Sequence, residues 1–287
     1  MSVAVPFRPS SGVFDDRYFI RPRVAAAVAD WIKNTIAVNN IFVSRIEDPC
    51  AGSGEMARHF QNATSYDLTP TSNDHGVKIL QRDFLTHTQA HEPGLLMVMN
   101  VPYGYCSAGA LTFINHATTF ADTLAVVVPS TWAREHNMVT KRVNKFFHLV
   151  DQWMLPPDSF YAPDNNNKTH DVPSVAQVWV RKPFPRVDTP RRATSPWFTA
   201  TRNEGWAIGT VPDLAVRRVG YIGQIVTGGF DTLTVGGWWF INILCEKRRV
   251  KQALKSIDWS AYGDRMGPQS INKTELITAV ENWLATN

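Results

Sequence analysis

Short apolar segments alternate with helical patterns along the first 180 residues, and this alternation constrains the fold more than any other feature of the sequence. Strands that alternate with helices form a parallel, doubly wound sheet with helices on both faces. We expect strands at residues 41–46, 63–67, 77–83, 95–100, 124–129, 149–155 and 174–181. The last two have no helical pattern between them, which predicts an antiparallel hairpin at the sheet edge. The expected fold class is α/β, with a Rossmann-like, seven-stranded, mostly parallel sheet.

Helical spacing of apolar residues marks the segments between these strands. Pro22 stands where a helix tolerates proline, in the first turn of a helix expected over residues 21–36. Further helices are expected over residues 109–120 and 132–147, and another is expected to begin at residues 55–60.

The pattern changes after residues 183–196, a segment rich in proline and arginine that predicts a linker. We therefore divide the chain into a domain at residues 1–185 and a smaller, mixed α+β domain at residues 186–287. In the second domain we expect strands at residues 206–211, 215–227 and 232–244, and helices at residues 246–257 and 273–284.

The charge of the chain is uneven. Residues 1–180 carry 14 basic and 16 acidic residues, a net charge of −2, whereas residues 181–287 carry 15 and 9, a net charge of +6. A basic region attached to a near-neutral domain indicates a polyanionic partner, with nucleic acid as the first candidate. A solvated helix face at residues 246–255 is the alternative explanation.

Several classes of protein do not fit the sequence. Its longest apolar stretches are far shorter than the roughly 18–20 residues of a membrane span, and its first residues lack the pattern of a secretory signal. Its three cysteines are widely spaced, and its eight histidines show no metal-ligand spacing. We expect a cytoplasmic protein without a metal site or a membrane partner.

The first strand runs into a turn at residues 48–54, Asp-Pro-Cys-Ala-Gly-Ser-Gly. A doubly wound sheet binds nucleotide-like ligands at such a place, outside the carboxyl ends of its strands. Gly52 and Gly54 permit a positive φ and a close backbone approach, and Asp48 and Cys50 belong to the same turn. The spacing matches neither the full dinucleotide fingerprint nor a phosphate loop, so a plain strand-to-helix turn is the alternative.

Two further acidic residues end the next two strands. Asp67 is placed to accept hydrogen bonds from ribose hydroxyls, and Asp83 is placed to accept the exocyclic amine of an adenine. Together with Asp48 they predict a ligand that contains adenosine and has no phosphate chain.

The fourth strand ends in Asn100-Val101-Pro102-Tyr103. This motif, preceded by the turn at residues 48–54, resembles the class I S-adenosylmethionine-dependent N6-adenine methyltransferases over residues 14–182. The segment Tyr18–Pro22 resembles the N-terminal motif that helps to hold the methionine end of the cofactor, which implies that Phe19 contacts it. The resemblance implies S-adenosylmethionine as the cofactor, bound by Asp48, Cys50, Gly52, Gly54, Asp67, Asp83 and Asn100 as well as Phe19.

The motif residues suit methyl transfer to an adenine amine, whose lone pair is delocalised into the ring. The Asn100 side-chain oxygen and the Val101 carbonyl can each accept one N–H of that amine. Pro102 keeps Val101 extended, and the Tyr103 ring would stack on the base, with Tyr105 lining the same pocket. Catalysis would come from alignment and electrostatics without a general base.

The resemblance places DNA ahead of RNA as the substrate. An Asn-X-Pro-Tyr with an aliphatic X also resembles ribosomal-RNA adenine dimethyltransferases, and a similar motif serves glutamine methyltransferases acting on protein. A non-catalytic nucleic-acid-binding protein with this fold is a further alternative. The recognition sequence, the choice between monomer and homodimer, and a restriction-modification or phage-encoded role stay open. Expected substrate contacts in the basic domain are Arg191, Arg192, Arg217, Arg218 and Arg248.

Overall fold

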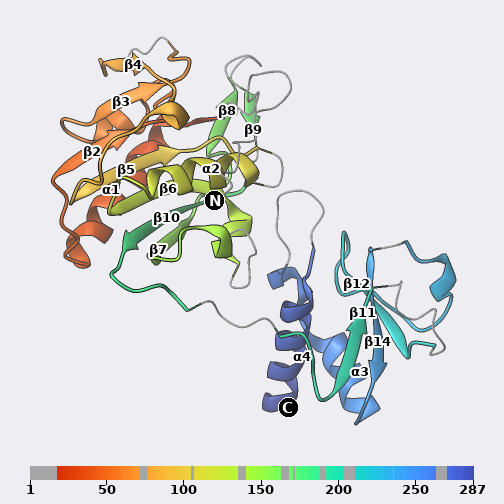
Figure 1. Cartoon of the computed structure of the whole chain (residues 1–287). Coiled ribbons are helices and arrows are strands. Elements are labelled where there is room, and N and C mark those ends of the chain that lie inside the picture. The colour runs from red at the N-terminus through yellow and green to blue at the C-terminus, as the bar shows by residue number, and fades with distance from the viewer. Residues whose placement is uncertain are drawn as a thin grey trace. The chain divides into compact units, whose positions relative to one another are not determined.

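The computed structural model divides into two compact units, Met1–Asp188 and Thr189–Asn287, which are described separately (Figure 1). The structure describes residues 18–71, 76–104, 107–134, 140–162, 168–170, 172–187, 192–202, 211–234, 236–262 and 270–287.

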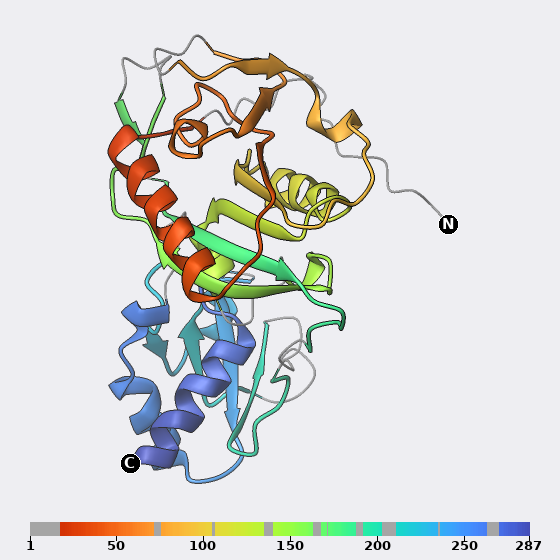
Figure 2. The ribbon, with the colours of Figure 1, turned by 90° about the vertical axis from the view of Figure 1, so that its left-hand side faces the viewer.

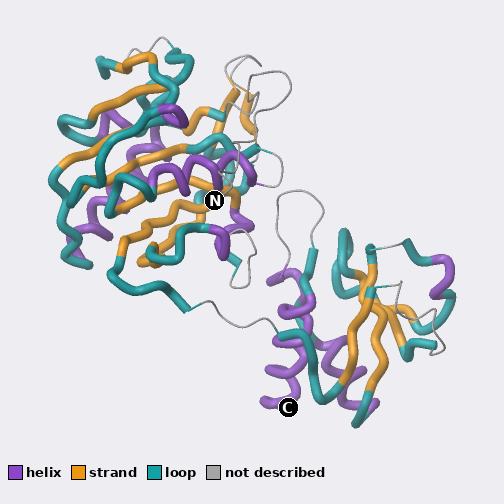
Figure 3. The backbone as a smooth tube through the Cα atoms, in the orientation of Figure 1, coloured by secondary structure: helices purple, strands orange, loops and turns teal. Residues whose placement is uncertain are grey.

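A seven-stranded sheet with the strand order β4-β3-β2-β5-β6-β10-β7 forms the centre of the first unit. The first five strands in this order run parallel to one another, and β10 lies antiparallel between β6 and β7. This confirms the mostly parallel sheet with an antiparallel edge hairpin, drawn in orange in Figure 3. The strands are β2 (Arg45–Asp48), β3 (Thr64–Asp67), β4 (Ile79–Gln81), β5 (Leu95–Asn100), β6 (Thr123–Pro129), β7 (Phe147–Met154) and β10 (Ser174–Arg181).

Among the described residues, two α-helices accompany this sheet, α1 (Pro22–Val38) and α2 (Ala108–Ala117). Pro22 begins α1, as expected, because the missing N–H of proline costs nothing at a helix start. The apolar face of α1 is buried at spacings of three and four residues, and the helix packs against β10, crossing the green strands obliquely in Figure 2. Trp31 Nε1 on α1 donates to Asp151 Oδ2 on β7 at 3.1 Å, which fixes the helix on this end of the sheet.

A small antiparallel sheet, β1-β8-β9, lies in the same unit. Its strands are β1 (Phe19–Ile20), β8 (Phe160–Ala162) and β9 (Lys168–His170). Phe19 is opposite Tyr161 in the register, so the segment before α1 is held by a strand about 140 residues later in the chain. This pairing was not predicted, because neither segment carries a long strand pattern.

The chain after β2 forms a 3-10 turn at Ala57–His59 and not the α-helix expected from residue 55. The connection from β2 to β3 is 15 residues long, close to the minimum of about a dozen for a crossover between parallel strands. Asn62 adopts a positive φ of 60° as the chain turns into β3. The expected helix is wrong because the backbone is already extended at Phe60, so the segment ends after a single 3-10 turn.

The helix expected over residues 132–147 is also absent from the described parts of that segment. The Asn144 N–H donates to Asn115 Oδ1 on α2 at 2.9 Å, so a tertiary hydrogen bond replaces a helical one. Local helical spacing is a weak signal that such contacts override. The segment contains 3-10 turns at Ser130–Ala133 and Thr140–Arg142, and residues 135–139 lie outside the described ranges.

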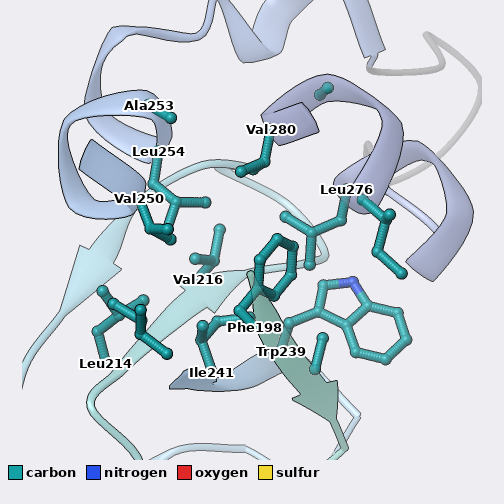
Figure 4. Close-up of a cluster of buried hydrophobic side chains, with 14 of the residues drawn as sticks. Phe198, Leu214, Val216, Trp239, Ile241, Val250, Ala253, Leu254, Leu276 and Val280 are labelled. Carbon is teal, nitrogen blue, oxygen red and sulfur yellow. The ribbon is translucent and has the colours of Figure 1, made fainter. Parts of the chain in front are cut away.

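The second unit packs two helices against one face of an antiparallel sheet with the order β11-β14-β12-β13. In Figure 4, side chains of both helices, Val250 and Leu276 among them, point toward Val216 and Ile241 of the sheet. A mixed α+β unit was expected. Its elements are β11 (Phe198–Thr201), β12 (Leu214–Arg217), β13 (Ile225–Val226), β14 (Trp238–Ile243), α3 (Lys247–Ser256) and α4 (Lys273–Thr286).

Several strand predictions in this unit need correction. The segment at residues 215–227 contains two short strands joined by a turn, because the positive φ values of Gly220 and Gly223 interrupt the extended backbone. The strand β14 begins at Trp238 and not at residue 232, and β11 was not predicted. The strand expected at residues 206–211 falls almost entirely outside the described residues.

None of the described helices has both the length and the apolar composition that crossing a membrane requires.

The start of α4 provides a stability test. Asn272 accepts from the Glu275 N–H at 3.0 Å, and Glu275 accepts from the Asn272 N–H at 2.8 Å, which completes a capping box. We expect Asn272→Ala to lower the free energy of unfolding by about 0.5–2 kcal/mol in urea denaturation. Asn282→Ala, at an exposed position inside α4, is the control and should be neutral or slightly stabilising. Equal losses in the two variants would contradict a specific capping role.

Candidate functional site

A pocket of about 430 Å³ opens where the carboxyl ends of β2, β3 and β5 meet β1. Its volume falls in the range of small-molecule sites, roughly 300–1,000 Å³. Most of the predicted site residues of the first unit lie together in its wall, although sequence distances of up to 84 residues separate them. Those residues are Phe19, Asp48, Cys50, Gly52, Asp67, Asp83, Asn100, Val101, Pro102 and Tyr103.

Gly52 lies in this wall, close to the ring of Phe19. Its N–H donates to Asp67 Oδ2 at 2.9 Å, which joins the end of β2 to the end of β3. It takes a φ of 54°, and a Cβ added here would lie 3.3 Å from the Phe19 ring. Glycine is therefore required both for the backbone conformation and for the close approach of the aromatic ring.

Gly54 has a different place. It lies outside the lining of the pocket, and a Cβ added here would meet the Val77 side chain at 3.3 Å. Its φ of 87° also calls for glycine. The structure thus gives Gly54 a packing position against the segment before β4, and its predicted contact with a cofactor has no support from the geometry.

Asp48 is an almost completely buried carboxyl group, with 1% of its surface exposed. Its Oδ1 accepts from the Cys50 N–H at 3.1 Å, and its Oδ2 has no hydrogen-bond partner among the described residues. Loss of solvation raises the pKa of Asp48 to about 8, the Cys50 N–H opposes this rise, and the negative charge of Asp67 adds to it. Burial likewise raises the pKa of the Cys50 thiol, so this cysteine is a neutral packing group.

Asp67 and Asp83 each begin a loop and hold it by their side chains. Asp67 Oδ1 accepts from the Thr69 N–H at 2.8 Å, in addition to the bond from Gly52. Asp83 Oδ1 accepts from the Leu85 N–H at 2.9 Å. A carboxylate has about four acceptor positions, so Asp67 can still accept the hydroxyl groups of a ligand.

The side-chain amide of Asn100 is oriented by a residue that the sequence analysis did not single out as a contact. Asn100 Nδ2 donates to the Tyr18 carbonyl oxygen at 3.0 Å. A carbonyl only accepts hydrogen bonds, so the nitrogen must face Tyr18 and Oδ1 is the side-chain acceptor that serves the pocket. Val101 follows with a buried side chain, and Pro102 restricts its backbone to the extended region.

Tyr103 is 7% exposed, and its hydroxyl forms a hydrogen bond within the protein. It lies 2.7 Å from Ser174 Oγ on β10, and that oxygen donates to the Val172 carbonyl at 2.8 Å. Ser174 has one proton, so Tyr103 donates to Ser174. Burial raises the pKa of Tyr103, which remains a neutral phenol that contributes the surface of its ring to the pocket.

Two contacts around the Asn-Val-Pro-Tyr segment were not predicted from the sequence. Gly109, at the start of α2, is so close that an added Cβ would lie 2.7 Å from the Pro102 carbonyl oxygen. A lone glycine inside a helical pattern is a signal for such a contact. Tyr161 on β8 packs its ring against Phe19 with a centroid distance of 5.8 Å, which the sequence gives no means of predicting.

Three of the arginines predicted to contact substrate bind other residues of the second unit. Arg192 forms an ion pair with Glu281. Arg217 Nε donates to the Val219 carbonyl at 3.0 Å, and Arg218 Nη1 donates to the Gly236 carbonyl at 3.2 Å. Their contact with a substrate stays a prediction.

Three predicted substrate contacts remain to be placed. Arg248 lies exposed on the first turn of α3. Arg191 and Tyr105 lie outside the described residues. In the part of the chain that is described, no group of three or more His, Cys, Asp or Glu side chains could hold a metal ion.

Residues 51–185 match the model of a protein family described as the EDM2 methyltransferase-like domain. This match covers the parallel sheet from β3 onward and the wall that contains Asn100. The first unit therefore has a methyltransferase fold. No curated protein matches the sequence.

Solved structures with a similar chain path include several methyltransferases. The 23S rRNA methyltransferase ErmE is 19% identical, with 60% of this chain and 72% of that chain covered and a TM-score of 0.37. Magnesium protoporphyrin IX methyltransferase from Synechocystis PCC 6803 with bound SAM is 14% identical, with 56% and 79% covered and a TM-score of 0.37. The type IIG restriction endonuclease BpuSI is 11% identical, with 64% and 26% covered and a TM-score of 0.41. Likeness at this level does not bear on the substrate.

The buried Asp48 predicts a specific dependence of stability on pH. Its folded-state pKa of about 8 lies above the ordinary value of 3.8, so the folded protein holds a proton that the unfolded chain has lost between these limits. This contribution to stability is present below pH 4 and is lost as the pH rises through 8. We expect Asp48→Asn to change the melting temperature least near pH 4. At pH 9 it should rise by several degrees, since 1 kcal/mol shifts a domain of this size by roughly 2–4 °C.

Asp122→Asn is the control with the opposite sign. Partial burial raises the pKa of Asp122, but hydrogen bonds from the Gly94 N–H and His91 outweigh burial and hold it below its usual value. Removing this carboxylate should therefore destabilise the protein more at pH 9 than at acid pH. Parallel pH profiles for wild type and Asp48→Asn would show that Asp48 is not held protonated.

Proposed function

We propose that the protein transfers a methyl group from S-adenosylmethionine to the exocyclic amine of adenine in DNA. The orientation of Asn100 carries this proposal. Its Nδ2 donates to the Tyr18 carbonyl, so Oδ1 is left as the acceptor at the end of β5, and both Asn100 and Val101 line the pocket. The Asn100 oxygen and the carbonyl of the adjacent Val101 would together match the two N–H groups of a primary aromatic amine.

The pocket fits the proposed cofactor. Asp67 retains acceptor positions for ribose hydroxyls, and Asp83 stands where an adenine amine can be accepted. The buried Oδ2 of Asp48 has no hydrogen-bond partner among the described residues, and a cationic ligand beside it would favour the ionised carboxylate, which can accept from a donor on that ligand. Phe19 and Gly52 form the wall for the methionine end. When bound, S-adenosylmethionine supplies the electrophilic methyl group.

The residues of the chain act by binding and alignment. Asn100 Oδ1 and the Val101 carbonyl accept the two N–H groups and so favour a pyramidal nitrogen whose lone pair faces the methyl group. After the nitrogen gains the methyl group, it loses one of its two protons to water. The ring of Tyr103, held by its bond to Ser174, gives the base a fixed surface. Such preorganised acceptors lower the barrier without a general base.

The charge distribution supports a nucleic acid as the substrate, and the resemblance of the sequence motifs to those of DNA enzymes favours DNA over RNA. We assign catalysis to residues 1–185 and duplex binding to residues 186–287, since residues 181–287 carry 15 basic against 9 acidic residues. An adenine in a duplex must leave the stack before it can enter a pocket, at a cost of a few kcal/mol. Favourable phosphate contacts of the basic region would offset that cost.

The decisive variant is Asn100→Ala. We expect it to reduce methyl transfer by roughly 10²–10³-fold, the usual effect of removing one transition-state hydrogen bond, with cofactor affinity nearly unchanged in calorimetry. Asn100→Asp is the matched control: it keeps an acceptor oxygen but cannot donate to the Tyr18 carbonyl, so activity should be only partly restored. Full activity of Asn100→Ala would overturn the mechanism.

The substrate is tested with a labelled methyl group and separate samples of duplex DNA, single-stranded DNA, RNA and protein extract. We expect N6-methyladenine in the duplex sample, identified by mass spectrometry after digestion to nucleosides. Label in RNA or on glutamine would replace the proposed substrate. Failure to bind S-adenosylmethionine would overturn the proposal as a whole.

A further inference from the structure

The turn between β12 and β13 presents a nearly fully exposed aromatic ring. Tyr221, within residues 218–224, has 83% of its surface exposed, whereas the neighbouring Ile222 packs against the buried core of the second unit. Isolated exposed apolar residues are common on proteins. The surroundings of Tyr221 distinguish it from such residues.

The turn is rigid. Gly220 and Gly223 take φ values of 83° and 82°, and a Cβ added to Gly223 would fall 2.0 Å from the Trp259 ring. The Gly223 N–H donates to the Arg217 carbonyl at 3.0 Å, and the Ile271 N–H donates to the Arg218 carbonyl at 2.9 Å. Because the backbone is fixed before any partner binds, a contact made by Tyr221 costs little conformational entropy.

Arg217 connects the exposed ring to charge and to a polar side chain. Its guanidinium carbon lies 5.9 Å from the centroid of the Tyr221 ring and 5.4 Å from that of Trp238. Its Nη1 lies 3.4 Å from Gln224 Oε1, and Gln224 is exposed on the same turn. A flat apolar surface, a fixed cation and an exposed amide are thus presented together.

We propose that Tyr221 stacks on a nucleobase of DNA while Arg217 faces the adjoining backbone phosphate. Aromatic rings beside arginine are the usual platform for unpaired bases. A protein surface could also cover Tyr221, but the excess of basic over acidic residues in residues 181–287 favours a polyanion. This inference rests on the proposed function, because it names a contact with the same DNA.

Fluorescence anisotropy of the full-length protein with labelled duplex DNA that has a short single-stranded end tests the stack. We expect Tyr221→Ala to weaken binding by roughly 5- to 150-fold, the range for the loss of one base stack, and Tyr221→Phe to keep most of the affinity. Leu244→Ala, at another exposed apolar position of the same unit, is the matched control and should bind like the wild type. Thermal unfolding of all variants should be unchanged because both side chains are exposed.

Photocrosslinking of the wild type gives a second measurement that does not depend on a variant. DNA with 5-iodouracil in place of thymine should crosslink to Tyr221, identified by mass spectrometry of the peptide. Wild-type affinity of Tyr221→Ala, absence of this crosslink, or Tyr221-dependent binding of RNA but not DNA would overturn the inference.

The outcomes separate this inference from the proposed function. If a Tyr221→Ala variant methylates adenine and binds DNA with normal affinity, the stacking contact is wrong and the proposed function stands. If DNA binding depends on Tyr221 but the protein transfers no methyl group, the stacking contact stands and the proposed function is wrong.

Discussion

The hydrogen bond from the Gly52 N–H to Asp67 is the constraint on which the pocket depends. It joins the carboxyl ends of β2 and β3, and the positive φ of Gly52 turns the chain so that no side chain blocks the ring of Phe19. Phe19 in turn is held from the other side by its pairing with Tyr161. Three segments that are distant in sequence thus meet at one glycine.

The Asn-Val-Pro-Tyr segment is supported in the same way from both ends of the domain. Tyr18, which precedes the first strand, orients the amide of Asn100, and Ser174, on the antiparallel strand β10, fixes the hydroxyl of Tyr103. The antiparallel hairpin at the sheet edge therefore has a part in the site. Both supports are hydrogen bonds in buried or partly buried positions, where an unmade bond is costly.

The described part of the first unit contains few α-helices. The crossover after β2 contains a 3-10 turn in place of an α-helix, so no long helix begins behind the glycine turn. The polar ends of the loop are instead satisfied by side chains, with Asp48 accepting from Cys50 and Asp67 accepting from Gly52 and Thr69. This arrangement buries the carboxyl group of Asp48, which loses its solvation.

The sequence by itself determined the strand alternation, the antiparallel edge hairpin, and the chemical types that line the pocket, because these follow from local apolar patterns and from short motifs such as Asp48–Gly54 and Asn100–Tyr103. Only the tertiary structure decided that residues 55–60 and the described parts of residues 132–147 form no α-helix, that Gly54 packs outside the pocket, and that Tyr18 and Ser174 orient the motif. The reason is physical. Crossover length, side-chain orientation and partner choice depend on contacts between segments far apart in the chain, and no local pattern encodes them.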